Sequence, residues 1–206
     1  MKIDKPKIKI VEKSTFKDCL ENNSFDQVEI DKEDKVTIID NKINECVFRN
    51  VDFSNIEFVD VEFIDVIFDK CILSNKDFNK TIFTRVEFNN CKLLGTTFID
   101  SNLSNTKFSN CNTKYLNLSG SVLNNVSITD SEFNNCYFND TKIKGLELVN
   151  VDFTNSEFIN NNFRGIDFCK TKLEGITIDK TSIKGMILDE YKWISFAKVF
   201  DVVIKE

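Results

Sequence analysis

The sequence contains no histidine, one proline and six glycines in 206 residues. Without histidine the chain lacks the commonest general base, the usual partner of a Ser or Cys nucleophile, and every metal site that uses an imidazole ligand. So few prolines and glycines are unusual in a protein whose helices or strands are joined by ordinary loops. These absences argue against most classes of enzyme and against most conventional folds.

Long apolar stretches are missing as well. No run of 18 apolar residues exists, so no segment is expected to span a membrane. The N-terminal MKIDKPKIKI has lysines but no apolar core typical of a signal peptide, so we expect a cytoplasmic protein whose seven cysteines are reduced. The net charge of −6 argues against direct binding of nucleic acid, which requires a basic surface.

What the sequence does contain is a repeat of five residues. From Ile43 to Leu188 every fifth residue is apolar except Thr113; of these thirty centres sixteen are Phe, eight Leu and five Ile. Half of the residues two places before a centre are Ser, Thr or Cys, and the position two places after it favours Asn, Asp, Gly and Lys. A period of five fits neither a helix nor a single strand.

The repeat predicts a square coil. Residues two apart in an extended segment point to the same side, so the centre and the small residue before it both face inward. Residues that tolerate left-handed backbone then turn the chain, and four turns close one coil. Stacked coils place residue n above residue n+20 and bury a core that one coil cannot bury alone. Thirty pentads make about 7.5 coils without an insertion.

This pattern is similar to that of the pentapeptide-repeat proteins, in which a small residue, a polar residue, Leu or Phe, a polar residue and a turn residue follow one another. VDFTN (151–155), SEFIN (156–160) and SNLSN (101–105) match it directly. The resemblance implies an all-β solenoid, a right-handed quadrilateral β-helix, with a helix that caps its C-terminal end.

The two ends of the chain lie outside the repeat. We therefore divide the chain into an N-terminal cap with an imperfect first coil at 1–40, the pentapeptide-repeat β-helix at 41–190, and a C-terminal helix and strand at 191–206. Within the first part, KIKIV (7–11) alternates like a strand. STFKDCLENN (14–23) predicts a short helix that its first serine caps.

The C-terminal tail is aromatic. Tyr191, Trp193, Phe196, Val199 and Phe200 fall mostly at helical spacing, and the DVVIKE that follows predicts a closing strand. The stretch ILDEYKWISFAKVFDVVI resembles the end of the Qnr and MfpA subfamily, whose C-terminal module joins two rods into a homodimer. The resemblance implies that these five residues form a cap and a dimer interface. The alternative is that they only cap the last coil.

Five cysteines occupy the small inward position. Cys71, Cys91 and Cys111 lie 20 residues apart and are expected to stack as a ladder on one wall. A stack does not converge on one point, as the ligands of a metal ion must, and free cysteine packs well in a core. We therefore assign these three, and Cys46 and Cys136, to structural packing.

Other candidates for chemistry are few. Lys76 occupies an inward slot, and we expect its stem to carry the ammonium group out to solvent. Thr113, the one polar centre, has no functional explanation in the sequence. Because no insertion interrupts the pentads to build a cleft, we predict no catalytic residue, no cofactor and no metal, and hence no enzyme activity.

The outer surface is the remaining place for a function. The pentads with centres at 58, 78, 98 and onward form a wall that we call the acidic face. They hold three lysines against seven carboxylates: Glu57, Asp60, Asp77, Asp100, Asp140, Glu157 and Asp179. The wall with centres at 43, 63 and 83 is basic, with six basic residues against three acidic ones.

The resemblance to Qnr and MfpA implies a DNA-mimicking protein that binds a type II topoisomerase, DNA gyrase or topoisomerase IV, through the acidic face, and thereby counters quinolones or inhibits the enzyme. Qnr proteins protect through loops that project from the coils, and this chain has none. The alternative is a cytoplasmic structural or interaction scaffold with a different protein partner, which the basic wall and the modest acidity favour.

Overall fold

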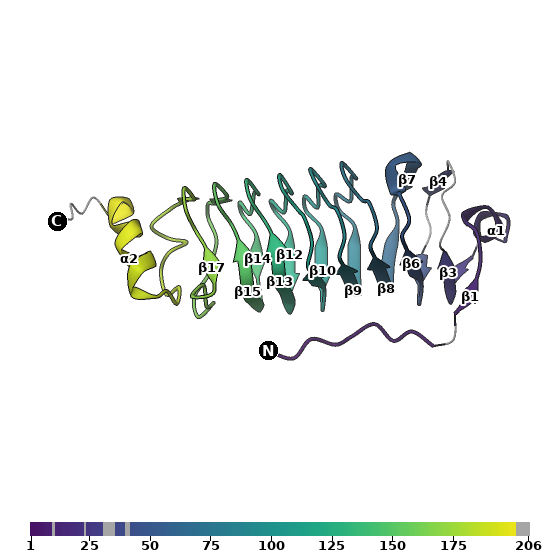
Figure 1. The fold of residues 1–206 in the computed structure, drawn as a ribbon, viewed down its shortest axis with the longest axis horizontal. Coiled ribbons are helices and arrows are strands. Elements are labelled where there is room, and N and C mark those ends of the chain that lie inside the picture. Colours follow the sequence, from purple (N-terminus) through teal and green to yellow (C-terminus); the bar gives the residue numbers. More distant parts are fainter. Residues whose placement is uncertain (10, 23, 31–35, 40–41, 201–206) are drawn as a thin grey trace.

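The computed structural model describes residues 1–9, 11–22, 24–30, 36–39 and 42–200. Figure 1 shows a rod of stacked coils with a helix at each end. The coils form a parallel β-solenoid of about 8 turns. The fold class predicted from the period of five is therefore confirmed. No helix in these residues is long and apolar enough to cross a membrane.

Short strands form the walls of the solenoid. In chain order they are β1 (Glu12–Lys13), β2 (Phe25–Asp26), β3 (Val28–Ile30), β4 (Val36–Ile39), β5 (Lys42–Asn44), β6 (Val47–Arg49), β7 (Ile56–Val59), β8 (Glu62–Asp69), β9 (Ile82–Asn89), β10 (Asn102–Ser104), β11 (Lys107–Ser109), β12 (Val122–Asn124), β13 (Val126–Glu132), β14 (Lys142–Ile143), β15 (Leu146–Asp152), β16 (Glu157–Phe158), β17 (Thr171–Lys172) and β18 (Thr177–Ile178).

The strands pair in parallel with strands one coil away. Phe63 of β8 lies opposite Phe83 of β9, and Ile128 of β13 lies opposite Leu148 of β15, so the offset is the predicted 20 residues. At the N-terminal end the offset is shorter, because Phe25 of β2 lies opposite Ile43 of β5. The coil that begins at Phe25 is therefore two residues shorter than the later ones.

The corners are made by residues in the left-handed region of backbone space. Asn90, Asp100 and Gly95 have φ of 57°, 58° and 67°, and most other turn positions of the repeat are similar. Asn, Asp and Gly adopt this conformation at low cost, which explains their preference for the fifth position. Tyr115 has φ of 62° and departs from this chemistry.

The core is a set of aromatic ladders. Phe68 and Phe88 stack with ring centroids 5.0 Å apart, and Phe88 and Phe108 stack 4.9 Å apart. These centres are fully buried. Burying each phenylalanine contributes on the order of 1.5–3 kcal/mol relative to an exposed one, so the inward row supplies the main driving force of the fold.

The N-terminal end is closed by α1 (Phe16–Glu21), whose N-cap is Thr15, one residue after the predicted Ser14. Phe16 is fully buried and stacks on Phe48 at 5.8 Å. The strand predicted over 7–11 is wrong, because residues 7–9 and 11 belong to no strand; Ile10 lies outside the described residues. The alternation has another cause, since Ile8 is half-buried against the rod between two exposed lysines.

The C-terminal end carries α2 (Glu190–Phe196), which continues into a 3₁₀ turn at Ala197–Phe200. Asp189 caps α2 by accepting a hydrogen bond from the Lys192 N–H at 2.9 Å. The closing strand predicted for DVVIKE lies outside the described residues. The proposed division of the chain at residues 40 and 190 stays a prediction.

Candidate acidic interaction face

One wall of the rod holds the carboxylates of the acidic face. Glu57 lies on β7 and Glu157 on β16, whereas Asp60, Asp100 and Asp140 occupy left-handed corners. Five of the seven side chains are exposed: Glu57, Asp60, Asp77, Asp100 and Asp140. The structure therefore places the predicted carboxylates on one wall, some at its corner and the others between corners.

The carboxylates toward the C-terminal end are tied into the rod. Asp179 accepts hydrogen bonds from the backbone N–H groups of Asn160, Thr181 and Ser182 at 2.6–2.8 Å. Burial raises the pKa of Asp179, but these hydrogen bonds outweigh it and hold the pKa well below the ordinary range. Glu157 accepts from the Asn139 amide at 2.5 Å. Of the exposed five, Asp77 accepts from the Asn79 N–H at 2.9 Å and Asp140 from the Asn160 amide at 2.5 Å, so Asp179 is the carboxylate with the fewest lone pairs left for a partner.

Lys76 sits beside the acidic face in a half-buried position. Its ammonium group donates to the backbone carbonyls of Ile56 and Ser54 at 2.8 and 3.2 Å. Burial lowers its pKa, while Glu57 and Asp52 act in the opposite direction. The side chain therefore reaches the preceding coil and bonds to its backbone there, which explains how a lysine is accommodated at a small inward position.

The acidic face carries its charges at a lower linear density than DNA does. The wall offers about one carboxylate per coil of ~4.8 Å, whereas duplex DNA carries one phosphate per ~1.7 Å. Lys80 and Lys180 reduce the net charge further. The face therefore provides a row of negative charges that is sparser than a phosphate backbone.

The five inward cysteines are buried and free; the other two are also free, and of these Cys19 is buried and Cys169 is partly exposed. In the ladder Cys71, Cys91 and Cys111, each thiol donates to a backbone carbonyl of the preceding coil at 3.3–3.4 Å. Burial raises the pKa of the Cys136 thiol to about 12, so it stays neutral and unreactive near neutral pH. Within the described residues, no group of three or more His, Cys, Asp or Glu side chains is placed to hold a metal ion.

Thr113 is fully buried among the phenylalanines. Its hydroxyl donates to the Glu132 carbonyl at 2.7 Å, so the polar centre is satisfied by the backbone of the next coil. Asp65 and Arg85 share two hydrogen bonds of 2.6 Å, a pair that was not predicted from the sequence. A signal was present, because the two residues have opposite charge and lie 20 apart at corner positions.

Two models of one repeat family match the sequence: "Pentapeptide repeat region" over residues 61–133, and "Pentapeptide repeats (8 copies)" over residues 136–175. The chain is a pentapeptide-repeat protein. The matched residues include Asp77, Asp100 and Asp140 of the acidic face. No curated protein matches the sequence.

Two solved structures are similar to this chain, and the first of them shares its fold. A trypsin-treated form of QnrB1, described as a plasmid-mediated fluoroquinolone resistance protein, is 19% identical, covers 96% of this chain and 98% of its own, and has a TM-score of 0.56. HetL from the cyanobacterium Nostoc sp. strain PCC 7120, described as involved in heterocyst differentiation regulation, is 12% identical over 86% of this chain and 98% of its own, with a TM-score of 0.30. The similarity to QnrB1, at this identity and TM-score, shows a common fold and nothing further.

The aromatic residues of the C-terminal tail separate into two groups in this pentapeptide-repeat protein. Phe196 is 3% exposed within the core, and Phe200 packs against that core. Tyr191, Trp193 and Ile194 are 84%, 54% and 50% exposed. The side chain of Val199 lies outside what the structure describes. One side of α2 therefore covers the last coil, and the other side presents apolar surface to solvent.

Proposed function

We propose that this pentapeptide-repeat protein is a non-catalytic binding protein whose acidic face occupies the DNA-binding groove of a type II topoisomerase, DNA gyrase or topoisomerase IV. The observation that carries the proposal is the row of five exposed carboxylates along one wall of a rod. The fold shared with a fluoroquinolone resistance protein supports it. The mechanism is electrostatic binding in the cytoplasm, with no chemical step.

We further propose that two rods join through the exposed side of α2 into a homodimer. Tyr191, Trp193 and Ile194 provide the apolar surface that such a contact needs. Joining two rods end to end doubles the length of the acidic face available to a groove. This compensates for the sparse charge, because the total number of carboxylates in the complex is also doubled.

The test is a supercoiling assay with purified DNA gyrase, run with and without ciprofloxacin. We expect the chain to change supercoiling, and the effect to weaken as salt rises, because exposed charges are screened. Replacing the five exposed carboxylates by their amides should raise the concentration needed for the same effect by about tenfold or more.

A matched variant controls for net charge. It replaces five exposed carboxylates on other walls by their amides: Asp130, Glu132, Glu147, Asp167 and Glu174. We expect it to act like the unmodified chain. If the unmodified chain neither binds gyrase nor changes supercoiling, with or without ciprofloxacin, the proposal is rejected. Protection from ciprofloxacin is scored separately from inhibition, because the chain has no projecting loops.

A second candidate function is an interaction scaffold for a different cytoplasmic protein. The basic wall, with Lys42, Arg85, Lys142, Lys144, Arg164 and Lys184, favours it because a DNA mimic has no use for this charge. A pull-down with the tagged chain from its own cytoplasm discriminates between the two. Gyrase subunits dominate the captured proteins under the first proposal and are absent under the second.

A further inference from the structure

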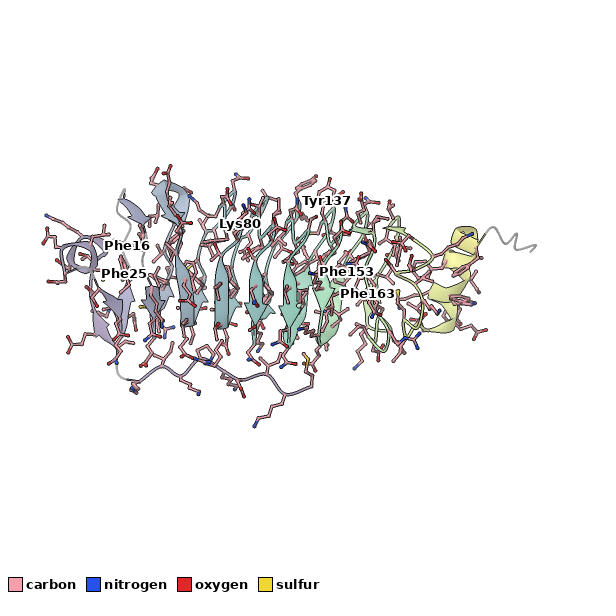
Figure 2. All side chains as sticks on the ribbon, turned by 180° about the vertical axis from the view of Figure 1, so that it is seen from behind. Phe16, Phe25, Lys80, Tyr137, Phe153 and Phe163 are labelled. Carbon is pink, nitrogen blue, oxygen red and sulfur yellow. The ribbon has the colours of Figure 1, made fainter. Side chains whose placement is uncertain are left out.

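The first nine residues lie lengthwise along the rod. In Figures 1 and 2 this segment, which we call the strap, runs back from β1 beneath the coils and ends near β13 and β15. It follows one corner, whose left-handed turn residues we call the corner row: Glu45, Asp65, Arg85, Asn105, Asn125 and Gly145. Ile3, Pro6 and Ile8 of the strap are half-buried, while its lysines are exposed.

The strap contacts the corner row through its backbone. The Lys7 N–H donates to Asp65 Oδ1 at 2.8 Å, and the Asp4 N–H donates to Asn105 Oδ1 at 3.3 Å. Three residues of strap therefore correspond to two coils of rod. Three extended residues span about 10 Å and two coils about 9.6 Å, so an extended chain keeps step with the corner over a long distance.

Met1 extends the same spacing of one contact for every three strap residues and two coils. It lies three residues before Asp4 and reaches Gly145, two coils beyond Asn105. A Cβ at Gly145 would come within 2.8 Å of the Met1 sulfur, so glycine at this corner leaves room for the strap. The corner row thus meets an extended chain at three successive points of equal spacing.

Charges along the strap match those of the corner row. Lys9 forms an ion pair with Glu45 at 3.7 Å. The pKa of the Arg85 guanidinium is raised first by its hydrogen bonds to Asp65 and further by the charge of Asp4, despite partial burial. Asp65 is itself buried and is fixed by Arg85, so its Oδ1 is held in place for a backbone N–H of the strap.

We propose that the corner row is a binding groove for an extended segment of a partner polypeptide that, like the strap, carries an acidic residue three places before a lysine, and that the strap is an internal ligand that this segment displaces. The recognition is mostly independent of side chains, since it uses backbone N–H groups at every third residue. An acidic residue three places before a lysine, as in Asp4 and Lys7, sets the register against Arg85 and Asp65. This groove lies apart from the acidic face and does not depend on topoisomerase binding.

The experiment uses the full chain and a fluorescent peptide with the sequence of residues 1–9. In the double variant Asp4→Pro with Lys7→Pro the strap loses both N–H donors. We expect the peptide to bind this variant at least about tenfold more tightly than it binds the unmodified chain. In the unmodified chain the tethered strap competes with the peptide at high effective concentration. Lys5→Pro is the matched control, because the Lys5 N–H makes no hydrogen bond in the part of the chain that the structure describes. It should behave like the unmodified chain.

A second peptide, N-methylated at its fourth and seventh residues, keeps every side chain and charge but lacks the two N–H groups. We expect it to bind the double variant at least about tenfold more weakly than the parent peptide. Equal affinity of the two peptides would show attraction by charge alone and overturn the proposal. So would equal binding of the parent peptide to the unmodified chain and the double variant, or no binding to either. Circular dichroism confirms that each variant keeps the solenoid.

Discussion

At the scale of single residues, the corner positions show where the repeat is under strain. Left-handed backbone costs an ordinary residue roughly 1–2 kcal/mol, which Asn and Asp reduce by local hydrogen bonds and glycine avoids. Tyr115 takes this conformation with 57% of its surface exposed, so packing does not offset much of the cost. Replacing Tyr115 by a residue that favours left-handed backbone should therefore stabilise the protein.

Tyr115→Asn should raise the free energy of unfolding by about 0.5–1 kcal/mol, because asparagine accepts the left-handed backbone more readily. Tyr137→Asn is the control, since Tyr137 is also an exposed tyrosine but does not have a positive φ. We expect that control to be neutral or slightly destabilising. Urea unfolding of the two variants measures both changes, and a loss of stability in Tyr115→Asn would mean that the ring has a packing role.

Asp65 should make stability depend on pH in the acid range. Burial raises the pKa of its carboxyl, but hydrogen bonds from Arg85 and from the Lys7 N–H outweigh burial and hold the pKa below that of the unfolded chain, about 3.9. The stabilisation is present above the unfolded pKa and is lost as pH falls through the folded one. The stability difference between the unmodified chain and Asp65→Asn should therefore be largest at pH 7 and shrink below about pH 4. A stability difference that does not change between pH 7 and pH 3 would contradict this expectation.

Much at this scale follows from the sequence, and some does not. The inward phenylalanines and the left-handed corners are predicted by the period of five, and the pairing of Asp65 with Arg85 follows from the offset of 20. The strap could not be predicted, because its nine residues have no register with the pentads. Its position depends on matching the rise of an extended chain to the spacing of the coils, which appears only once the coils are stacked.

At the scale of elements, α2 combines two tasks on opposite sides. Phe196 covers the last coil, whose backbone groups would otherwise be open to another chain. Trp193 and Ile194 point away from the core and are half exposed. The sequence predicts that Tyr191, Trp193, Phe196, Val199 and Phe200 together form a cap and a dimer interface. The pattern alone did not show which aromatic residues face the core, because helical spacing fixes relative but not absolute orientation.

The two sides of α2 should respond differently to truncation. Phe196→Ala should lower the free energy of unfolding by about 3 kcal/mol, because it leaves a cavity under the cap. The double variant Trp193→Ala with Ile194→Ala should leave stability of the monomer nearly unchanged but return the mass in light scattering from that of two chains to that of one. A mass that stays at two chains in the double variant would place the dimer contact elsewhere.

At the scale of the whole molecule, the repeat allows a pentad to occupy any of the four walls of the solenoid. Each pentad contacts mainly its neighbours in the chain and the pentads one coil away, so stability is close to a sum over coils. Removing complete pentads should therefore preserve the fold. The number removed decides which wall each later pentad occupies, and hence whether the acidic face stays continuous.

Two deletions test this dependence. Deleting 91–110 removes one coil and keeps the acidic face in line, whereas deleting 96–100 removes one pentad and turns Lys142, Lys144, Arg164 and Lys184 of the basic wall into line with Glu57, Asp60 and Asp77. Both deletions remove Asp100 and should fold, as judged by circular dichroism. Only the second should lose the effect on gyrase, by about tenfold or more. Equal activity of the two deletions would mean that a continuous acidic face is not what the topoisomerase contacts.

The separation of inward from outward positions has a consequence for how such proteins diverge. In each pentad the core and the corner constrain three residues, and the other two face solvent with little influence on folding. Partner choice can therefore change by drift on the walls while the scaffold persists, so two lineages can keep one shape at 19% identity. Relatives of this chain that share its ligand are best recognised by comparing single walls, read every 20 residues, rather than whole sequences.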